Sequence, residues 1–184
     1  AGQLLDSVDI GAPAGLRDRA LLALRLFTFA RIGAATAMRV EDVYVQHRRL
    51  WVRLHEKGGK AVDLPCHHSL EVYLHAYIEG ADLGGDTEGP LFRTIGRGTG
   101  RLTRRPMPVA SAYAMVQRRA QAAGIATHIG NHTFRATGIT AYLKNGGTLE
   151  RAAAIAHHAS TRTTQLYDRR SDVVNLDEIE RIAI

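Results

Sequence analysis

The hydrophobic period of the sequence changes twice along the chain, and this pattern constrains the fold more than any other feature. Residues 15–29 repeat apolar side chains at the spacing of an α-helix. Residues 43–64 instead alternate in short segments, which turn signals at 46–49 and 57–60 separate. The helical spacing returns after Pro65. The sequence therefore predicts an α+β protein that is mainly α-helical, with a small antiparallel β-sheet of two or three strands near its N-terminal third.

Further helical segments surround the predicted sheet, and loops rich in glycine divide them. Helices are expected over residues 33–38, 69–78, 108–123, 133–144, from Thr148 onward, 161–167 and 176–182. Loops are expected over 80–89 and 96–101. Residues 1–14 are interpreted as a linker remnant and residues 15–184 as one domain, because 45% of the chain is apolar and suffices for a core.

Composition excludes several classes of protein. A single cysteine rules out a disulfide framework and a cysteine-based zinc ribbon. Arginine and polar residues interrupt the longest apolar runs, so no segment is expected to cross a membrane. The N-terminus has no pattern of a signal peptide. A soluble intracellular protein is the expectation.

Net charge is concentrated in one part of the chain. Residues 89–149 contain nine basic and no acidic side chains, whereas the segments on either side are close to neutral. Of the 24 basic residues in the whole chain, 21 are arginine, whose planar guanidinium pairs with phosphate oxygens two at a time. The segment is either a solvated basic face or a surface that binds a polyanion.

Two groups of residues could carry chemistry on a phosphate. His132 and Arg135 are three apart, so a helix places them on one face, where an arginine can neutralise oxygens and an imidazole can move a proton. A surface pair near a helix start would look the same. His158 precedes Tyr167 by nine residues, and this tyrosine is either a packed aromatic or a nucleophile activated by neighbouring cations.

Taken in order along the chain, these residues fall into motifs. The order resembles that of the tyrosine recombinases, the phage-integrase and Xer-type family of site-specific DNA recombinases, over about residues 15–182. The motifs are Phe29-Ala30-Arg31-Ile32-Gly33 with Met38–Val43, Lys57-Gly58-Gly59-Lys60 with Leu64-Pro65, His132-Thr133-Phe134-Arg135-Ala136-Thr137, and Ala156 to Tyr167-Asp168. The resemblance implies a site-specific recombinase or integrase catalytic domain at 15–184, with the family's N-terminal core-binding domain absent from this chain.

The resemblance also implies how a DNA strand would be cut and rejoined. Tyr167 would be the nucleophile that forms a 3′-phosphotyrosyl intermediate, and Arg31 and Arg135 would hold the non-bridging phosphate oxygens. Lys57, or Lys60 as the second choice, would protonate the leaving 5′-oxygen.

The two histidines and the remaining arginines complete the implied site. His132 would accept the tyrosine proton or relay it, and His158 would hold a phosphate oxygen, so neither a metal nor another cofactor is expected. Double-stranded DNA is the expected partner, together with self-association into a tetrameric synapse, in a cytoplasmic, nucleoid-associated protein of bacterial or phage origin. The expected DNA contacts are Lys60, Arg97, Arg101, Arg104, Arg105, Arg118 and Arg119.

The apolar stripe over 173–184 would pack on its own domain or on a neighbouring protomer.

The sequence departs from the family pattern at three places. Phe29-Ala30 stands where Gly-Leu is common, and Ala156-His157 replaces Leu-Gly, so that His157 either crowds the site or points to solvent. Ala34 stands where the family often has an acid three residues after the arginine. Ala34 therefore leaves open how Arg31 is oriented.

Other functions are compatible with parts of the sequence. A zinc enzyme is disfavoured because residues 89–149 contain no acid and no His-Glu-x-x-His motif occurs. The remaining histidines are expected on strand and helix surfaces, among them His47, His55, His67, His68 and His75. A non-catalytic DNA-binding relic of a mobile element and a strand cleavage of the type IB topoisomerase kind stay as alternatives.

Overall fold

The computed structural model describes residues 2–130, 132–156, 174 and 176–184. Its helices are α1 (Gly2–Asp6), α2 (Pro13–Thr28), α3 (Ile32–Thr36), α4 (His68–Gly80), α5 (Val109–Ala122), α6 (Thr133–Lys144), α7 (Leu149–Ala156) and α9 (Leu176–Glu180), with a 3₁₀ turn η1 (Val40–Asp42). Its strands are β1 (Val43–Gln46), β2 (Arg49–His55), β3 (Ala61–Pro65), β4 (Arg93–Ile95) and β5 (Leu102–Pro106). The predicted fold class is confirmed, whereas the predicted helix over 161–167 lies outside the described residues.

The small sheet predicted from the alternating segment has three antiparallel strands in the order β1-β2-β3. Val52 pairs with Val43 on one side and with Leu64 on the other. Along β2, buried and exposed side chains alternate, which is the period-2 pattern of a sheet with one face on the core. The β2–β3 hairpin turns through Gly58 and Gly59, whose φ angles of 83° and 75° only glycine adopts without strain.

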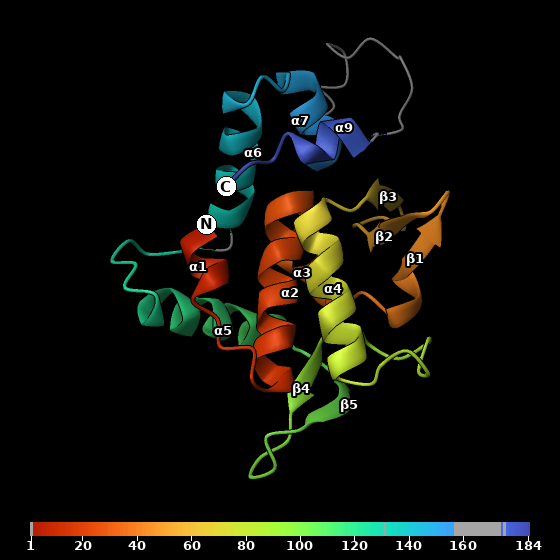
Figure 1. Ribbon diagram of the computed structural model, residues 1–184, viewed down its shortest axis with the longest axis vertical. Coiled ribbons are helices and arrows are strands. Elements are labelled where there is room, and N and C mark those ends of the chain that lie inside the picture. The colour runs from red at the N-terminus through yellow and green to blue at the C-terminus, as the bar shows by residue number, and fades with distance from the viewer. Residues whose placement is uncertain (1, 131, 157–173, 175) are drawn as a thin grey trace.

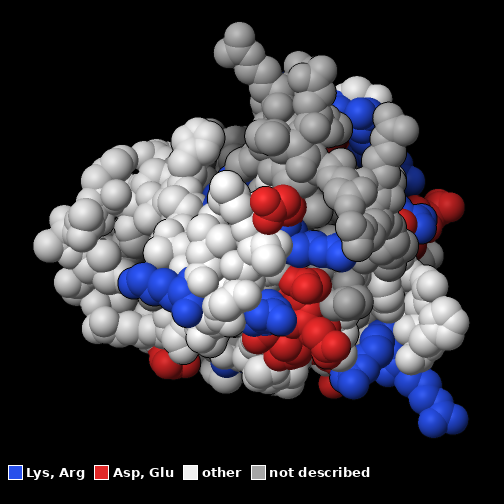
Figure 2. Space-filling view, turned by 90° about the horizontal axis from the view of Figure 1, so that it is seen from above, with Lys and Arg blue, Asp and Glu red and all other residues white. Residues whose placement is uncertain are grey.

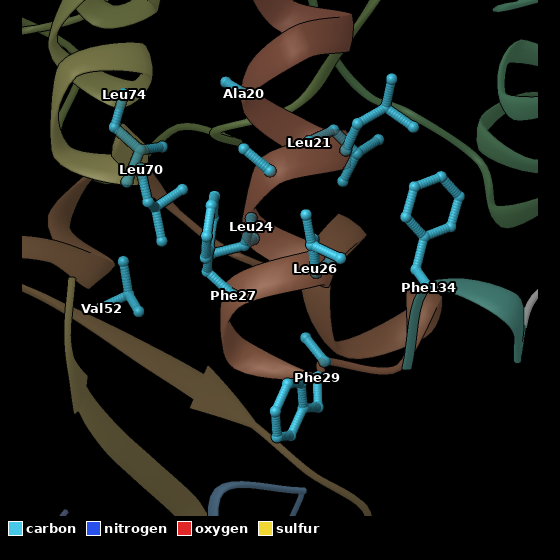
Figure 3. Close-up of a cluster of buried hydrophobic side chains, with 14 of the residues drawn as sticks. Ala20, Leu21, Leu24, Leu26, Phe27, Phe29, Val52, Leu70, Leu74 and Phe134 are labelled. Carbon is cyan, nitrogen blue, oxygen red and sulfur yellow. The ribbon is translucent and has the colours of Figure 1, made fainter. Parts of the chain in front are cut away.

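Helix α2 is the centre of the core. It packs against both α4 and α6, with α4 running alongside it in Figure 1. Because neighbours cover it on several sides, its apolar residues are buried around nearly the whole helix. Figure 3 shows Leu24, Leu26 and Phe27 of α2 between Leu70 of α4 and Phe134 of α6.

Helix α6 approaches α2 so closely that one position must be glycine. A Cβ atom added at Gly138 would lie 2.4 Å from the carbonyl oxygen of Leu26 and 2.5 Å from the ring of Phe29. The carbonyl oxygen belongs to the backbone of α2, so it cannot turn aside. The absence of a side chain at Gly138 therefore fixes the distance between the two helices.

Two local predictions differ from the structure. Residues 1–14 were predicted as a linker remnant, but they contain α1, whose Leu4 and Leu5 are buried in the core. The physical reason is that removing two leucine side chains from water stabilises the folded chain more than leaving them exposed in an extended segment. The β4–β5 hairpin was not predicted, because β4 has only three residues and β5 is rich in arginine and proline rather than in strand-forming residues.

The ends of the described chain lie close together. A side chain added at Gly2 would come within 3.7 Å of the backbone of Ile184, and the labels N and C are neighbours in Figure 1. Helix α9 is held from two directions, since Glu180 accepts hydrogen bonds from His68 at the start of α4 and Arg181 donates to the carbonyl of Gly146 after α6. No helix in the described part of the chain combines the length and the apolar character needed to cross a membrane.

Candidate active site

The sharp turn between α2 and α3 positions Arg31. Phe29 ends α2 in the left-handed conformation, with φ at 55°, and its ring is fully buried. Arg31 follows as the N-cap residue of α3, with its side chain 41% exposed. Its Nη1 donates to Oε2 of Glu56 at 2.9 Å. The buried ring of Phe29 therefore fixes the turn, and the accessible guanidinium of Arg31 follows two residues later.

The β2–β3 hairpin carries Lys57. The backbone N–H of Glu56 donates to the carbonyl of Lys60 at 2.8 Å and closes the hairpin at its base. Lys57 is exposed and lines the same cleft as Arg31, whereas Lys60 does not line it. Of the two lysines considered as proton donor, Lys57 is therefore the one whose side chain lies at the cleft.

Helix α6 supplies His132 and Arg135. His132 is exposed at the N-cap position, and Arg135 lies one turn further along, partly buried. The Nη2 of Arg135 donates to the carbonyl of Ala156 at the end of α7, and its buried Nε has no hydrogen-bond partner among the described residues. Burial lowers the pKa of Arg135, the nearby positive charge of Arg31 lowers it further, and Glu56 acts in the opposite direction. Arg135 is therefore in an environment that favours an additional anion.

These side chains meet in one open cleft of about 490 Å³. The residues that line it are Ala30, Arg31, Ile32, Gly33, Ala34, His55, Glu56, Lys57, His132 and Arg135. Four of the six predicted catalytic residues thus come together from three separate segments. The other two, His158 and Tyr167, lie outside the described residues. Three cations around a single cleft form a binding site suited to a phosphate group.

None of the predicted DNA contacts is among the described residues that line this cleft. Arg97 and Arg101 are exposed in the β4–β5 loop, which forms the lower end of the molecule in Figure 1, opposite α7. Arg104 and Arg105 are exposed on β5, and Arg118 is exposed on α5. On the face seen from above in Figure 2, basic side chains lie among acidic ones. The basic segment 89–149 is therefore distributed over several parts of the fold.

Arg93 and Arg119, two arginines of the basic segment 89–149, make contacts inside the protein. Arg119 was predicted to contact DNA, but its Nε and Nη2 donate to Oδ2 of the buried Asp18 at 3.0 and 2.7 Å. Arg17 donates to the other oxygen of Asp18 at 2.9 and 2.7 Å. Arg93 is buried and donates to the carbonyl of Pro90 and to Asp86. A count of charge along the sequence cannot distinguish such internal ion pairs from exposed cations.

Glu56, the carboxylate in the cleft, was not predicted from the sequence. Its only signal in the sequence is a position next to Lys57. The expectation that His67 lies on a surface is wrong, because its ring is 5% exposed and stacks on Phe27 at 4.0 Å between ring centroids. With His68 and Glu180 it forms the one group of metal-ligating residue types close together in the described chain. Its Nδ1 accepts the N–H of Ser69, so the proton sits on Nε2, which faces Glu180 at 3.4 Å. The group is a hydrogen-bonded cluster that holds α9 on α4.

Comparison with known proteins identifies the class. The model of the phage integrase family matches residues 1–173, and the chain belongs to this family. It is similar to tyrosine recombinase XerD of Mycobacterium tuberculosis (strain CDC 1551 / Oshkosh), with 33% identity over 160 residues that cover 84% of this chain and 48% of the relative. XerD of Mycobacterium leprae (strain TN) is 35% identical over 164 residues, with the same two shares. The chain thus spans about half the length of the curated relatives it matches.

Solved structures show the same fold. The XerA recombinase superposes with a TM-score of 0.68 at 20% identity, over 93% of this chain and 58% of that one. The XerH recombinase, solved in a pre-cleavage complex with its difH substrate, superposes with a TM-score of 0.66 at 19% identity, over 90% of this chain and 47% of that one. The resemblance to the tyrosine recombinases that the motifs indicated is confirmed.

Proposed function

We propose that this chain is the DNA-cleaving domain of a site-specific recombinase, and that it breaks and rejoins strands through a 3′-phosphotyrosyl intermediate. The observation that carries the proposal is the cleft itself. Arg31, Lys57, His132 and Arg135 come from distant parts of the sequence and share one opening. Membership of the phage integrase family supports the same reaction.

The proposed reaction conserves the energy of the broken bond. The hydroxyl oxygen of Tyr167 attacks the scissile phosphorus, a Tyr–O–P bond forms, and the bond from phosphorus to the 5′-oxygen breaks. His132 takes the tyrosine proton, and Lys57 gives a proton to the leaving 5′-oxygen. Attack of a 5′-hydroxyl on the phosphotyrosine reverses these steps and joins a strand without an external energy source.

The arginines stabilise the charge that develops during the reaction. Arg31 and Arg135 hold the non-bridging oxygens of the pentavalent phosphorus, and each is worth about 3–4 kcal/mol of transition-state stabilisation. His158 is proposed to hold a further phosphate oxygen. Cationic side chains supply the charge that the reaction needs, so the proposal includes no metal or other cofactor.

The proposed partner is double-stranded DNA in the bacterial cytoplasm, with a tetrameric synapse as the working assembly. The solved complex of XerH with its difH substrate supports the choice of DNA. Because phosphate contacts dominate, DNA affinity should fall steeply as salt increases. Exposed arginines such as Arg97 and Arg101 should each contribute about one unit to the slope of log affinity against log salt, whereas Arg119, which is bound to Asp18, should contribute little. Alanine variants at the three positions, titrated at several salt concentrations, measure these slopes.

A suicide substrate tests the proposed reaction. This DNA duplex carries a nick beside the scissile phosphate, so that the released fragment diffuses away and the covalent complex accumulates. Wild-type protein should form an adduct that survives denaturing electrophoresis, Tyr167→Phe should form none, and Glu79→Gln, at an exposed site on α4 outside the cleft, should react as the wild type does. Absence of an adduct with wild-type protein, or an equal adduct with Tyr167→Phe, would contradict the proposal. Relaxation of supercoiled DNA without strand exchange would instead support the topoisomerase alternative.

A further inference from the structure

Glu56 occupies an unusual place for an acid. Of the described residues that line the cleft, it alone is acidic, and its side chain is only 9% exposed. A carboxylate that competes with a phosphate for the same cations should disfavour DNA binding. Its burial there also costs free energy unless a partner compensates it. The position therefore requires an explanation that the reaction steps do not give.

The contacts of Glu56 connect the two sides of the cleft. Its backbone N–H closes the β2–β3 hairpin on Lys60, and its Oε2 accepts a hydrogen bond from Nη1 of Arg31 at 2.9 Å. One residue thus joins the hairpin that carries Lys57 to the start of α3. Ala34 lines the same cleft one helical turn beyond Arg31 and has no group that could hold the guanidinium. Within the described chain, the carboxylate of Glu56 is the polar group that holds the side chain of Arg31.

The geometry leaves Arg31 able to act on a substrate. Among the described residues, Glu56 engages a single nitrogen of Arg31, and its second Nη and its Nε have no other partner there that would compete with an incoming oxygen anion. The same carboxylate lies close enough to Arg135 to offset part of the repulsion that Arg31 exerts on it. Two cations that must converge on one phosphate repel each other while the cleft is empty, and an anion placed beside them reduces this cost.

We infer that Glu56 is a positioning residue for the cleavage reaction: it holds the guanidinium of Arg31 beside Arg135 and fixes the Lys57 hairpin against α3. The inference rests on the proposed function. Glu56 acts through Arg31 and Lys57 and does not touch the substrate. Its removal should therefore lower the rate of the chemical step without weakening DNA binding.

Rate and affinity, measured separately, test the inference. With Glu56→Gln, the rate constant of adduct formation at saturating suicide substrate should fall about 10- to 100-fold, since a displacement near 1 Å of a catalytic group costs about that much. DNA affinity should stay the same or increase, because a negative charge leaves the neighbourhood of the phosphate. Glu56→Asp keeps the charge and should recover part of the rate. Glu79→Gln, which removes the same charge from an exposed site on α4, should match the wild type. An unchanged rate constant in Glu56→Gln overturns the inference, and so does weaker binding that accounts for the whole loss.

A second readout does not depend on cleavage. In the DNA-free protein labelled with ¹⁵N-arginine, the guanidinium signals of Arg31, assigned with Arg31→Lys, should show slow rotation in the wild type and in Glu79→Gln. They should show fast rotation in Glu56→Gln. If wild-type protein forms no adduct, the proposed function fails, and the spectrum still decides whether Glu56 orders Arg31. Equal rotation in all three proteins overturns the inference, and circular dichroism of each variant verifies its fold.

Discussion

The close contact of α6 with α2 makes a sharp prediction for Gly138→Ala. The added Cβ would lie 2.4 Å from the carbonyl oxygen of Leu26, whereas ordinary contact begins at 3.4 Å, so α6 must move outward by about 1 Å at this point. Overpacking of this kind costs about 1–3 kcal/mol, and the better helix propensity of alanine returns about 1 kcal/mol of it. The net expectation is a decrease of up to about 2 kcal/mol in the free energy of unfolding.

The effect on cleavage should be larger than the effect on stability. Arg135 lies three residues before Gly138 on the same helix, so an outward shift of about 1 Å moves its guanidinium away from the phosphate and costs about 100-fold in rate. Urea denaturation and adduct formation on the suicide substrate measure the two effects. Gly85→Ala is the control, because a Cβ there meets nothing within 4 Å. A variant that is destabilised yet cleaves at the wild-type rate would refute the link between helix packing and catalysis.

Two further predictions concern stability. Asp18→Asn keeps the shape of the side chain but leaves the guanidinium groups of Arg17 and Arg119 around a neutral amide. The free energy of unfolding, measured in urea, should therefore fall by about 3–5 kcal/mol. A loss below about 1 kcal/mol would contradict this account of the ion pairs. The protein should also lose stability as pH falls from about 6.5 toward 4, because burial lowers the pKa of His67 to about 4. In this range His67 binds a proton in the unfolded chain but stays neutral in the folded chain, which favours unfolding. Burial raises the pKa of Glu180, but the hydrogen bonds from His68 together with the electrostatic interactions with His67 and His68 lower it overall, so Glu180 adds a further loss of stability as pH falls below about 4.5. Unfolding free energies of wild type and His67→Gln across this range measure the effect, and an equally steep dependence in both proteins would exclude His67 as the cause.

The elements with a strong local signal could be predicted from the sequence. The apolar repeat of α2, the alternation of β1–β3 and the glycine pair in the hairpin each express a rule that acts within a few residues. The β4–β5 hairpin and α1 are different, because contacts with distant parts of the chain stabilise them more than their own propensities do. Such elements have little signal in a single sequence.

The same division applies to the site. The order of the motifs predicted Arg31, Lys57, His132 and Arg135, and the structure brings all four to one cleft. Glu56 could not be predicted, because its function follows from a contact with a residue 25 positions away. The internal pairing of Arg119 with Asp18, 101 positions apart, was hidden for the same reason.

Gly2 and Ile184, the two ends of the described chain, lie next to each other on the folded domain. A linker of a few residues could join the ends at a small entropic cost, and the ring could then be opened elsewhere, for example in the exposed segment at Gly84-Gly85. Such a circular permutant would keep α2, the β2–β3 hairpin and α6 intact as segments. The order in which the chain is synthesised can thus be changed without changing which side chains meet in the cleft.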